Sequence, residues 1–435
     1  MIWEGHYWSL LGLGEAARHY ALALDELGMA VSARCVEWTD DRYLLSSDTT
    51  ARLEGLLARE AEPGEVRVQH VLPPSFQHHA EAAANVGCTT FDADGIPRSW
   101  AAACNRMDEI WVPSRFCLEA FSASGVPEER IRVIPHGVDS ARFAARVEPL
   151  PVCVGKHFTF LSVFDWVQRK GWDVLLRAYL SEFHPSEDVC LLIRATRLDT
   201  WQLRDFVARE FAAGPRPAVV ILPFAVPEAA MPSLYALADA FVLPSRGEGW
   251  GIPFGEAMAA GLPTIATRWG GNLDFMDDDN SFLIDIEGLV PIDRELQAQL
   301  GAEPGLRQAE PSVDHLAQTM RWVFEHQKDA RAKGRAARAT MRRHFTWQHA
   351  AVKIAARIEA LGEHHNVPLR GVAARLLDRG SLSSRSDAAG IADLVVERLA
   401  ELEEVDALVG EVLQAYEANR KRPRRRREPK GEQRS

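Results

Sequence analysis

Residues 243–267 read LPSRGEGWGIPFGEAMAAGLPTIAT, the order of a buried strand, a glycine-rich turn, a helix and a second strand. Pro253 suits the first turn of a helix, and the glycines before it let the backbone approach a ligand closely. Unpaired amides at a helix N-terminus, together with the helix dipole, favour a phosphate group there. The stretch therefore predicts an α/β fold with an anion site after its first strand.

Two acids flank this turn, Glu248 within it and Glu256 in the following helix. A carboxylate accepts hydrogen bonds from two neighbouring hydroxyls, so one acid can hold the ribose of a nucleotide and the other the hydroxyls of a sugar. From these residues alone a plainer interpretation stays open. In it, Glu248 accepts hydrogen bonds from turn amides, and Glu256 is an exposed helix residue favoured by the dipole.

The same alternation of short apolar runs and amphipathic helical stretches extends along the chain, and it is typical of parallel sheets covered by helices. Strands are expected at residues 30–36, 66–71, 86–90, 109–112, 131–134, 158–164, 189–193, 219–222, 240–243 and 263–266. Helices are expected at residues 15–27, 115–124, 172–183, 231–238 and 254–260, and in series over 313–361. Ser114 is the expected N-cap of the second of these helices.

The chain has 435 residues, of which 47% are hydrophobic, enough for two domains that each bury a core. A Pro- and Val-containing stretch at 147–154 separates the halves, so we predict doubly wound domains at 1–150 and 151–365. Ligands of such folds bind beyond the carboxyl ends of the strands. Residues 366–435 form a connector, an amphipathic helix and a basic disordered tail. The apolar stripe of that helix suits either a homo-oligomer seam or packing on its own protein.

Bulk properties narrow the classes of partner and compartment. A formal net charge of -11 argues against nucleic-acid binding by phosphate neutralisation. Neither a signal peptide nor a transmembrane span is evident, so we expect a cytoplasmic protein whose basic tail allows peripheral contact with the inner membrane face. The scattered cysteines indicate reduced core thiols, and the absence of a zinc-type His/Cys cluster predicts no metal site.

With these residues in place, 243–267 resembles the Glu-x7-Glu motif of retaining GT-B glycosyltransferases, in particular family 4, the glycosyltransferase group 1 type. Further stretches also look like that family, at 12–20, 111–116, 125–139 and 158–178. The resemblance thus covers most of residues 1–355. It implies two Rossmann-like domains facing a central cleft, with the acceptor on the first domain and the nucleotide sugar on the second.

The resemblance implies roles for particular residues. Glu248 would contact and orient the transferred sugar, Lys170 would neutralise the departing diphosphate, and Glu256 would bind the donor ribose. Further donor contacts are expected from Arg169, Gly249, Trp250, Gly251, Ile252, Gly12 and Gly14. No separate cofactor is implied besides the donor itself, a GDP-, UDP- or ADP-sugar.

This chain departs from the family pattern at two places. Many members have an Arg near the end of the strand before the lysine, where this chain has Phe164 and Asp165. Arg169 or Arg194 can substitute for it, and a surface salt-bridge role is the favoured alternative for either residue. The segment 90–97 lacks the family's His. Acceptor binding is therefore assigned to Asp92, Asp94 and His136, with turn formation by the acids and a structural hydrogen bond from His136 as open alternatives.

The sequence thus predicts a retaining glycosyltransferase that moves a sugar from a nucleotide diphosphate to an acceptor hydroxyl, in glycan or glycoconjugate synthesis. Two other functions stay open. One is a nucleotide-sugar epimerase or phosphorylase of the same fold. The other is a non-catalytic glycan-binding scaffold that uses its C-terminal helix to assemble partners.

Overall fold

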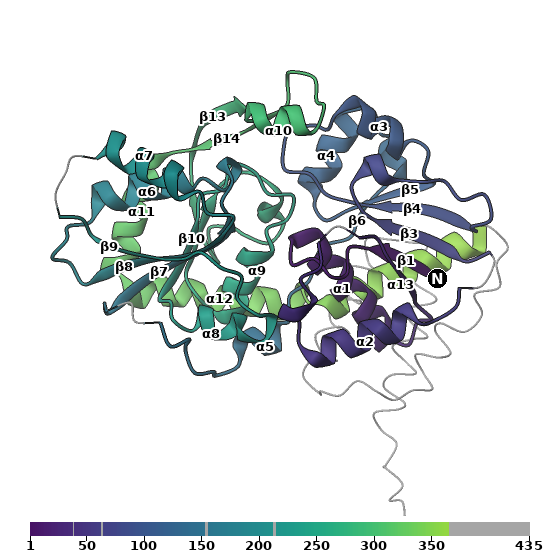
Figure 1. Ribbon diagram of the computed structural model, residues 1–435, viewed down its shortest axis with the longest axis horizontal. Helices are drawn as coiled ribbons and strands as arrows, with labels where there is room; N and C mark the ends of the chain where they lie inside the picture. Colours follow the sequence, from purple (N-terminus) through teal and green to yellow (C-terminus); the bar gives the residue numbers. More distant parts are fainter. Residues whose placement is uncertain (38, 62–63, 153–154, 212–214, 365–435) are drawn as a thin grey trace, which may run out of the picture. The chain divides into compact units, whose positions relative to one another are not determined.

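The structure, a computed structural model, describes residues 1–37, 39–61, 64–152, 155–211 and 215–364. Two six-stranded sheets and the helices around them make up most of it (Figure 1). This confirms the predicted α/β class with two Rossmann-like units. The segment 366–435, with its predicted helix and tail, lies outside the described residues. Among the described residues, no helix combines the length and the apolar character needed to cross a bilayer.

The first sheet has the strand order β2-β1-β3-β4-β5-β6, and all its neighbouring strands run parallel. Its strands are β1 (Ile2–Gly5), β2 (Ser32–Cys35), β3 (Val66–His70), β4 (Ala84–Cys88), β5 (Glu109–Val112) and β6 (Ile131–Val133). The helices along this half of the chain are α1 (Gly12–Glu26), α2 (Ser47–Leu57), α3 (Arg98–Cys104), α4 (Arg115–Ala123) and α5 (Ser140–Ala144). Ser114 caps α4 as predicted, because its side chain accepts a hydrogen bond from the Cys117 amide.

Strand β1 was not among the predicted strands. It has four residues and no apolar run, yet it lies between β2 and β3 inside the sheet. Trp3 is fully buried there, and Glu4 pairs with Arg67 of the neighbouring strand. Burial of alternate residues against α1 thus decides this strand, and four residues are too few for that alternation to be recognised in a sequence.

The second sheet has the strand order β12-β11-β10-β7-β8-β9 and is also parallel. Its strands are β7 (Phe158–Asp165), β8 (Val189–Thr196), β9 (Ala218–Leu222), β10 (Ala240–Leu243), β11 (Thr264–Thr267) and β12 (Phe282–Ile284). The helices of this half are α6 (Trp172–Glu182), α7 (Thr200–Glu210), α8 (Met231–Tyr235), α9 (Ile252–Ala260), α11 (Val313–Glu325) and α12 (Gln327–His344). Short 3-10 turns occur at Arg42–Leu44, Pro73–Ser75, Glu128–Arg130, Gln168–Lys170, Glu228–Ala230 and Gly271–Asp274.

An antiparallel hairpin of β13 (Ile286–Pro291) and β14 (Arg307–Pro311), with α10 (Arg294–Gln299) between them, follows β12. Neither the hairpin nor β12 was predicted. Partly buried and exposed residues alternate along β13, and β12 has only three residues, so neither carries the long apolar run used to find the other strands.

The last helix, α13 (Trp347–His364), packs against α1 and β3 of the first half (Figure 1). The Val138 amide donates a hydrogen bond to the Phe345 carbonyl at 2.9 Å, which joins the link between the two sheets to the start of this helix. The chain therefore ends its described part on the first sheet. The domain limits at 150 and 365 stay predictions.

The strand order of the second sheet places its topological switch point between β7 and β10, which are neighbours in the sheet but far apart in the chain. From β7 the connections proceed to β8 and β9 on one side, and from β10 to β11 and β12 on the other. Ligands of doubly wound sheets bind where the loops diverge at such a point. These loops contain Lys170 after β7 and Glu248 after β10.

Candidate functional site

The loop after β10 is anchored by the buried guanidinium of Arg246. It pairs with Asp173 of α6 at 2.8 Å and with Glu310 of β14 at 2.7 Å. Backbone bonds add to this, because the Arg246 amide donates to the Arg169 carbonyl at 2.7 Å. A charge-assisted network that is satisfied on both sides holds the glycine-rich turn rigid beneath the residues that carry the chemistry.

This anchor gives a stability prediction. We expect Arg246→Met to lower the free energy of unfolding by about 3 kcal/mol, because the buried Asp173 and the partly buried Glu310 lose the cation that joins them, while Asp173 keeps its pair with Arg177. Urea unfolding measures the loss. The matched control is Arg268→Met, whose pair with Asp278 is exposed, and for which the cost should stay below about 1 kcal/mol. Equal losses in the two variants would contradict the anchoring role.

Glu248 and Lys170 meet at the switch point. Lys170 Nζ donates to Glu248 Oε1 at 2.5 Å, and Arg169 Nη1 lies 3.4 Å from the same oxygen. Burial alone would raise the pKa of Glu248, but the two cations outweigh it and lower that pKa. Glu248 is therefore an ionised carboxylate inside the protein, and its side chain is held by Lys170 and Arg169.

The glycines of the turn admit a segment of the first half of the chain. A side chain at Gly249 would lie 1.9 Å from Thr90 Oγ1. Its amide donates to Asp92 Oδ1 at 2.7 Å, and its carbonyl accepts from Ser114 Oγ at 2.7 Å. The sequence predicts that the glycines before Pro253 allow close approach of a ligand. At Gly249 the close approach is made by the protein's own 90–92 segment.

Asp92 thereby touches two of the residues assigned to the donor. One carboxylate oxygen accepts from Gly249, and the other lies 3.2 Å from Arg169 Nε. Asp94 does something else, because it binds the backbone amide and the guanidinium of Arg307 at 2.7 and 2.8 Å. Of the two candidate acceptor acids, Asp92 borders the loop, and Asp94 holds strand β14.

Helix α9 begins as the sequence predicts. Gly251 is its N-cap with a φ of 97°, a conformation that favours glycine, and Pro253 stands in the first turn. Ile252 lies opposite Gly12, because a Cβ added at Gly12 would be 3.8 Å from the Ile252 side chain. Gly14 packs elsewhere, since a Cβ there would lie 2.5 Å from the Ser9 carbonyl oxygen. Gly12 thus borders the start of α9, and Gly14 allows α1 to pack on the preceding turn.

Glu256 is 6% exposed, which contradicts the interpretation of an exposed helix residue. Tyr235 of α8 donates to its Oε2 at 2.7 Å. Burial, reinforced by the carboxyl group of Glu15, raises the pKa of Glu256 to about 8. Glu256 also lines a small cavity together with Glu15 and Ile252, so a polar group that enters this cavity meets a carboxyl group able to donate or accept a hydrogen bond.

Trp250 and His136 lie in an aromatic cluster. Trp250 is 3% exposed, and its ring centre lies 4.6 Å from that of Phe275. His136 Nδ1 shares a hydrogen bond with the Tyr20 hydroxyl at 2.8 Å, and burial lowers the pKa of His136 to about 3. A neutral, bonded His136 fits the structural alternative. Trp250 fits core packing better than the donor contact expected from the resemblance.

Two residues beside Glu256, Tyr235 and Glu15, were not predicted as parts of the site. Both stand in ordinary amphipathic helices, where nothing in their spacing marks them. They are found only because α8 and α1 bring them to α9. The structure does bring together Lys170, Arg169, Glu248 and Asp92 in one cluster of charges.

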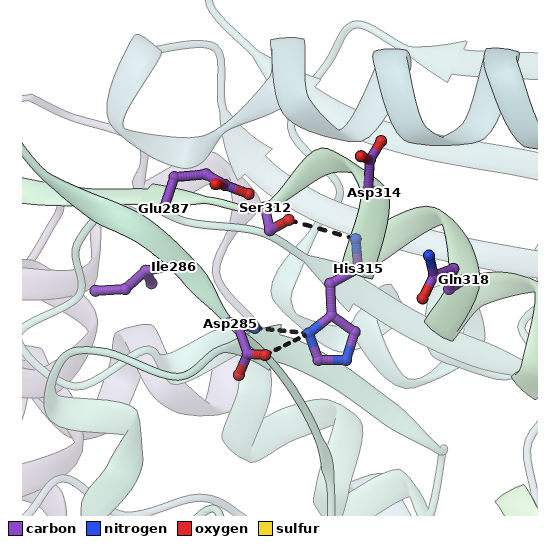
Figure 2. A pocket seen from close by; sticks show the side chains of 7 residues that line it. All are labelled: Asp285, Ile286, Glu287, Ser312, Asp314, His315 and Gln318. Carbon is purple, nitrogen blue, oxygen red and sulfur yellow. Dashed lines mark hydrogen bonds and ion pairs between the residues drawn. The ribbon is translucent and has the colours of Figure 1, made fainter.

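An open groove elsewhere shares no residue with this cluster. It is lined by Asp285, Glu287, Ser312, Asp314, His315, Ile286 and Gln318. Figure 2 shows the His315 ring turned towards Asp285, whose amide and one carboxylate oxygen lie 3.0 and 3.1 Å from its Nδ1. The Ser312 hydroxyl accepts a hydrogen bond from the His315 amide at 3.4 Å, so this polar group of the groove caps the N-terminus of α11.

Comparisons with known proteins agree with this geometry. Residues 155–291, which include Lys170, Glu248 and Glu256, match the family described as glycosyl transferases group 1. A GDP-mannose-dependent alpha-(1-6)-phosphatidylinositol monomannoside mannosyltransferase of Mycolicibacterium smegmatis is 28% identical over 190 residues, 38% of this chain and 46% of that protein. A D-inositol 3-phosphate glycosyltransferase of Acidothermus cellulolyticus is 29% identical over 242 residues, 52% of this chain and 51% of that protein.

The chain spans about half the length of these curated relatives. Among solved structures, HepE of Anabaena in complex with UDP and glucose has a TM-score of 0.60 at 14% identity, over 82% of this chain and 99% of that one. This likeness concerns the fold, and it confirms the predicted GT-B architecture.

Proposed function

We propose that this chain is a retaining hexosyltransferase that uses a nucleotide diphosphate sugar, and the match of residues 155–291 to the family described as glycosyl transferases group 1 supports the proposal. One observation carries the proposal, the buried Lys170–Glu248 pair at the switch point. Glu248 lies in the glycine-rich turn after β10, and helix α9, which follows this turn, contains Glu256. An acid for the sugar and an acid for the ribose thus follow one another along one strand–loop–helix unit, and the loop after the neighbouring strand β7 adds a cation for the departing diphosphate.

The distances are compatible with this division of work. An ammonium group has three donors, and Lys170 uses one of them on Glu248. The others remain for oxygens of a diphosphate. Glu248, ionised and held by two cations, is a fixed acceptor for sugar hydroxyls, while Glu256 keeps one oxygen on Tyr235 and offers the other. Rigid charges of this kind act by preorganisation, because they need not rearrange as the reaction proceeds.

In the proposed reaction the bond between the anomeric carbon and the phosphate oxygen breaks, and a bond to the acceptor oxygen forms on the same face. The acceptor's proton passes to the departing phosphate oxygen. We propose that the acceptor meets the donor at Asp92, which is bound to Gly249 and Arg169. Asp94 and His136 would act through Arg307 and Tyr20, as supports of that face.

The donor would be a GDP-, UDP- or ADP-sugar and the acceptor a glycan or other hydroxyl compound. Two relatives favour a polyol acceptor, since their names refer to inositol-containing substrates.

The test is incubation with each donor class and a panel of inositol phosphates, glycosides and glycolipids, with the product anomer assigned by NMR. Product of inverted configuration would contradict retention. Donor consumption without any acceptor would favour an epimerase or hydrolase. Binding without turnover on every acceptor would favour the scaffold.

A further inference from the structure

Arg194, near the carboxyl end of strand β8, is a cation that the described residues leave without a partner. Arg194 is half-buried, and its Nε is buried without a hydrogen-bond partner. Within the described residues, its guanidinium makes neither a hydrogen bond nor an ion pair. A partly buried cation without a partner lowers the stability of a folded protein, so packing does not account for this arginine.

Arg194 lies beside the donor site. In the sheet it pairs with Val163 of β7, the strand that leads to Lys170 at the switch point. The carboxyl groups near enough to act on its charge are those of Asp165, Glu256 and Glu15, while burial lowers its pKa overall. The two acids Glu15 and Glu256 line the cavity described above. Arg194 is therefore a cation at the carboxyl end of the sheet, near Glu256, with free donors.

Arg169, the other candidate for a second phosphate-binding cation, is already engaged. Its Nη1 donates to the Gly247 carbonyl at 2.6 Å, and its guanidinium faces Asp92 and Glu248. These carboxylates outweigh burial and raise its pKa. Its charge is thus compensated inside the protein, and a phosphate group would have to displace an existing ion pair to reach it.

We propose that Arg194 binds the diphosphate of the nucleotide-sugar donor, as the second cation beside Lys170. This rests on the proposed function. A diphosphate brings about two negative charges to a place where Lys170 is already paired with Glu248, so a further uncompensated cation is needed. The planar guanidinium suits phosphate oxygens because it can donate two parallel hydrogen bonds.

The test uses the full chain and two measurements, the Kd for a nucleotide and the midpoint of thermal unfolding. Replacement of an arginine that only supports the fold would weaken binding and lower the midpoint at the same time. UDP, GDP and ADP are titrated into the native protein, and the tightest of them into Arg194→Met, Arg194→Lys and the exposed control Arg204→Met. We expect Arg194→Met to raise the Kd about tenfold or more and Arg194→Lys to raise it less, with Arg204→Met unchanged. Without ligand, Arg194→Met should have a higher midpoint of thermal unfolding than the native protein, because an unsatisfied buried charge is gone.

Each other result decides against one of the two proposals. If the native protein binds none of the three nucleotides, the proposed function itself fails. If it binds one of them and Arg194→Met binds it within about threefold, the assignment of Arg194 alone is overturned. A lower unfolding midpoint for Arg194→Met, or its failure to fold, would identify Arg194 as a structural residue and equally overturn the assignment.

Discussion

Lys170→Ala should lower kcat by about 10²–10³-fold while the protein keeps its fold. The ammonium lies 2.5 Å from Glu248 at the switch point, where the proposed reaction develops negative charge on the departing diphosphate. Removal of a preorganised donor from such a place acts on the transition state more than on donor binding, so kcat should fall more than KM rises. Steady-state kinetics with the donor class that yields product in the incubation test measures both constants.

The control for this prediction is Lys328→Ala, which removes the same group from an exposed position of α12. It should leave kcat unchanged. Arg169 stays 3.4 Å from Glu248 when Lys170 is replaced, so the buried carboxylate keeps one cation and the chain should still fold, as circular dichroism would verify. Turnover of Lys170→Ala close to the native value would refute the assigned role.

Glu256→Ala should lower kcat/KM by about 10²-fold or more, because a charged or strongly polar acceptor of two ribose hydroxyls is lost. The residue is buried and bound to Tyr235, so its position is set before any ligand arrives. Donors that lack a ribose hydroxyl supply the matching test. The native enzyme should discriminate against a deoxyribose donor, and Glu256→Ala should no longer do so. Equal discrimination by both would contradict ribose binding at Glu256.

The raised pKa of Glu256 also predicts how stability depends on pH. The folded protein holds this proton up to a pKa of about 8, whereas the unfolded chain releases it near 4.5. Between these values the folded state binds more protons, so the free energy of unfolding should decrease as pH rises. The decrease attributable to this group is at most about 1.4 kcal/mol per pH unit.

Glu256→Gln isolates that contribution, because it keeps the shape and cannot ionise. Urea unfolding at several pH values from 5 to 9 should show a shallower decrease for Glu256→Gln than for the native protein. The two curves should become parallel about one pH unit above the pKa of about 8, where the folded native protein has also lost this proton. The same slope in both proteins over the whole range would show that Glu256 does not hold a proton in the folded state.

The local order of residues was enough to predict the parts whose signal lies in neighbouring positions. The strand–turn–helix unit at 243–260, the N-cap at Ser114 and the strands with long apolar runs were confirmed. Strand β1 and the β13–β14 hairpin were missed, since short strands are decided by pairing with distant segments and leave little pattern in four to six residues.

The sequence alone thus specified a glycine-rich turn before a helix, the acids Glu248 and Glu256 eight residues apart, and Lys170 after another strand. Tertiary structure alone decided their surroundings. It placed Asp92 on Gly249 and paired Arg169 with carboxylates, and within the described part of the chain it left Arg194 without a partner. It also brought Glu15 and Tyr235 to Glu256. The reason is physical: charge pairing, burial and pKa depend on distances between segments far apart in the chain, and spacing along a sequence does not contain those distances.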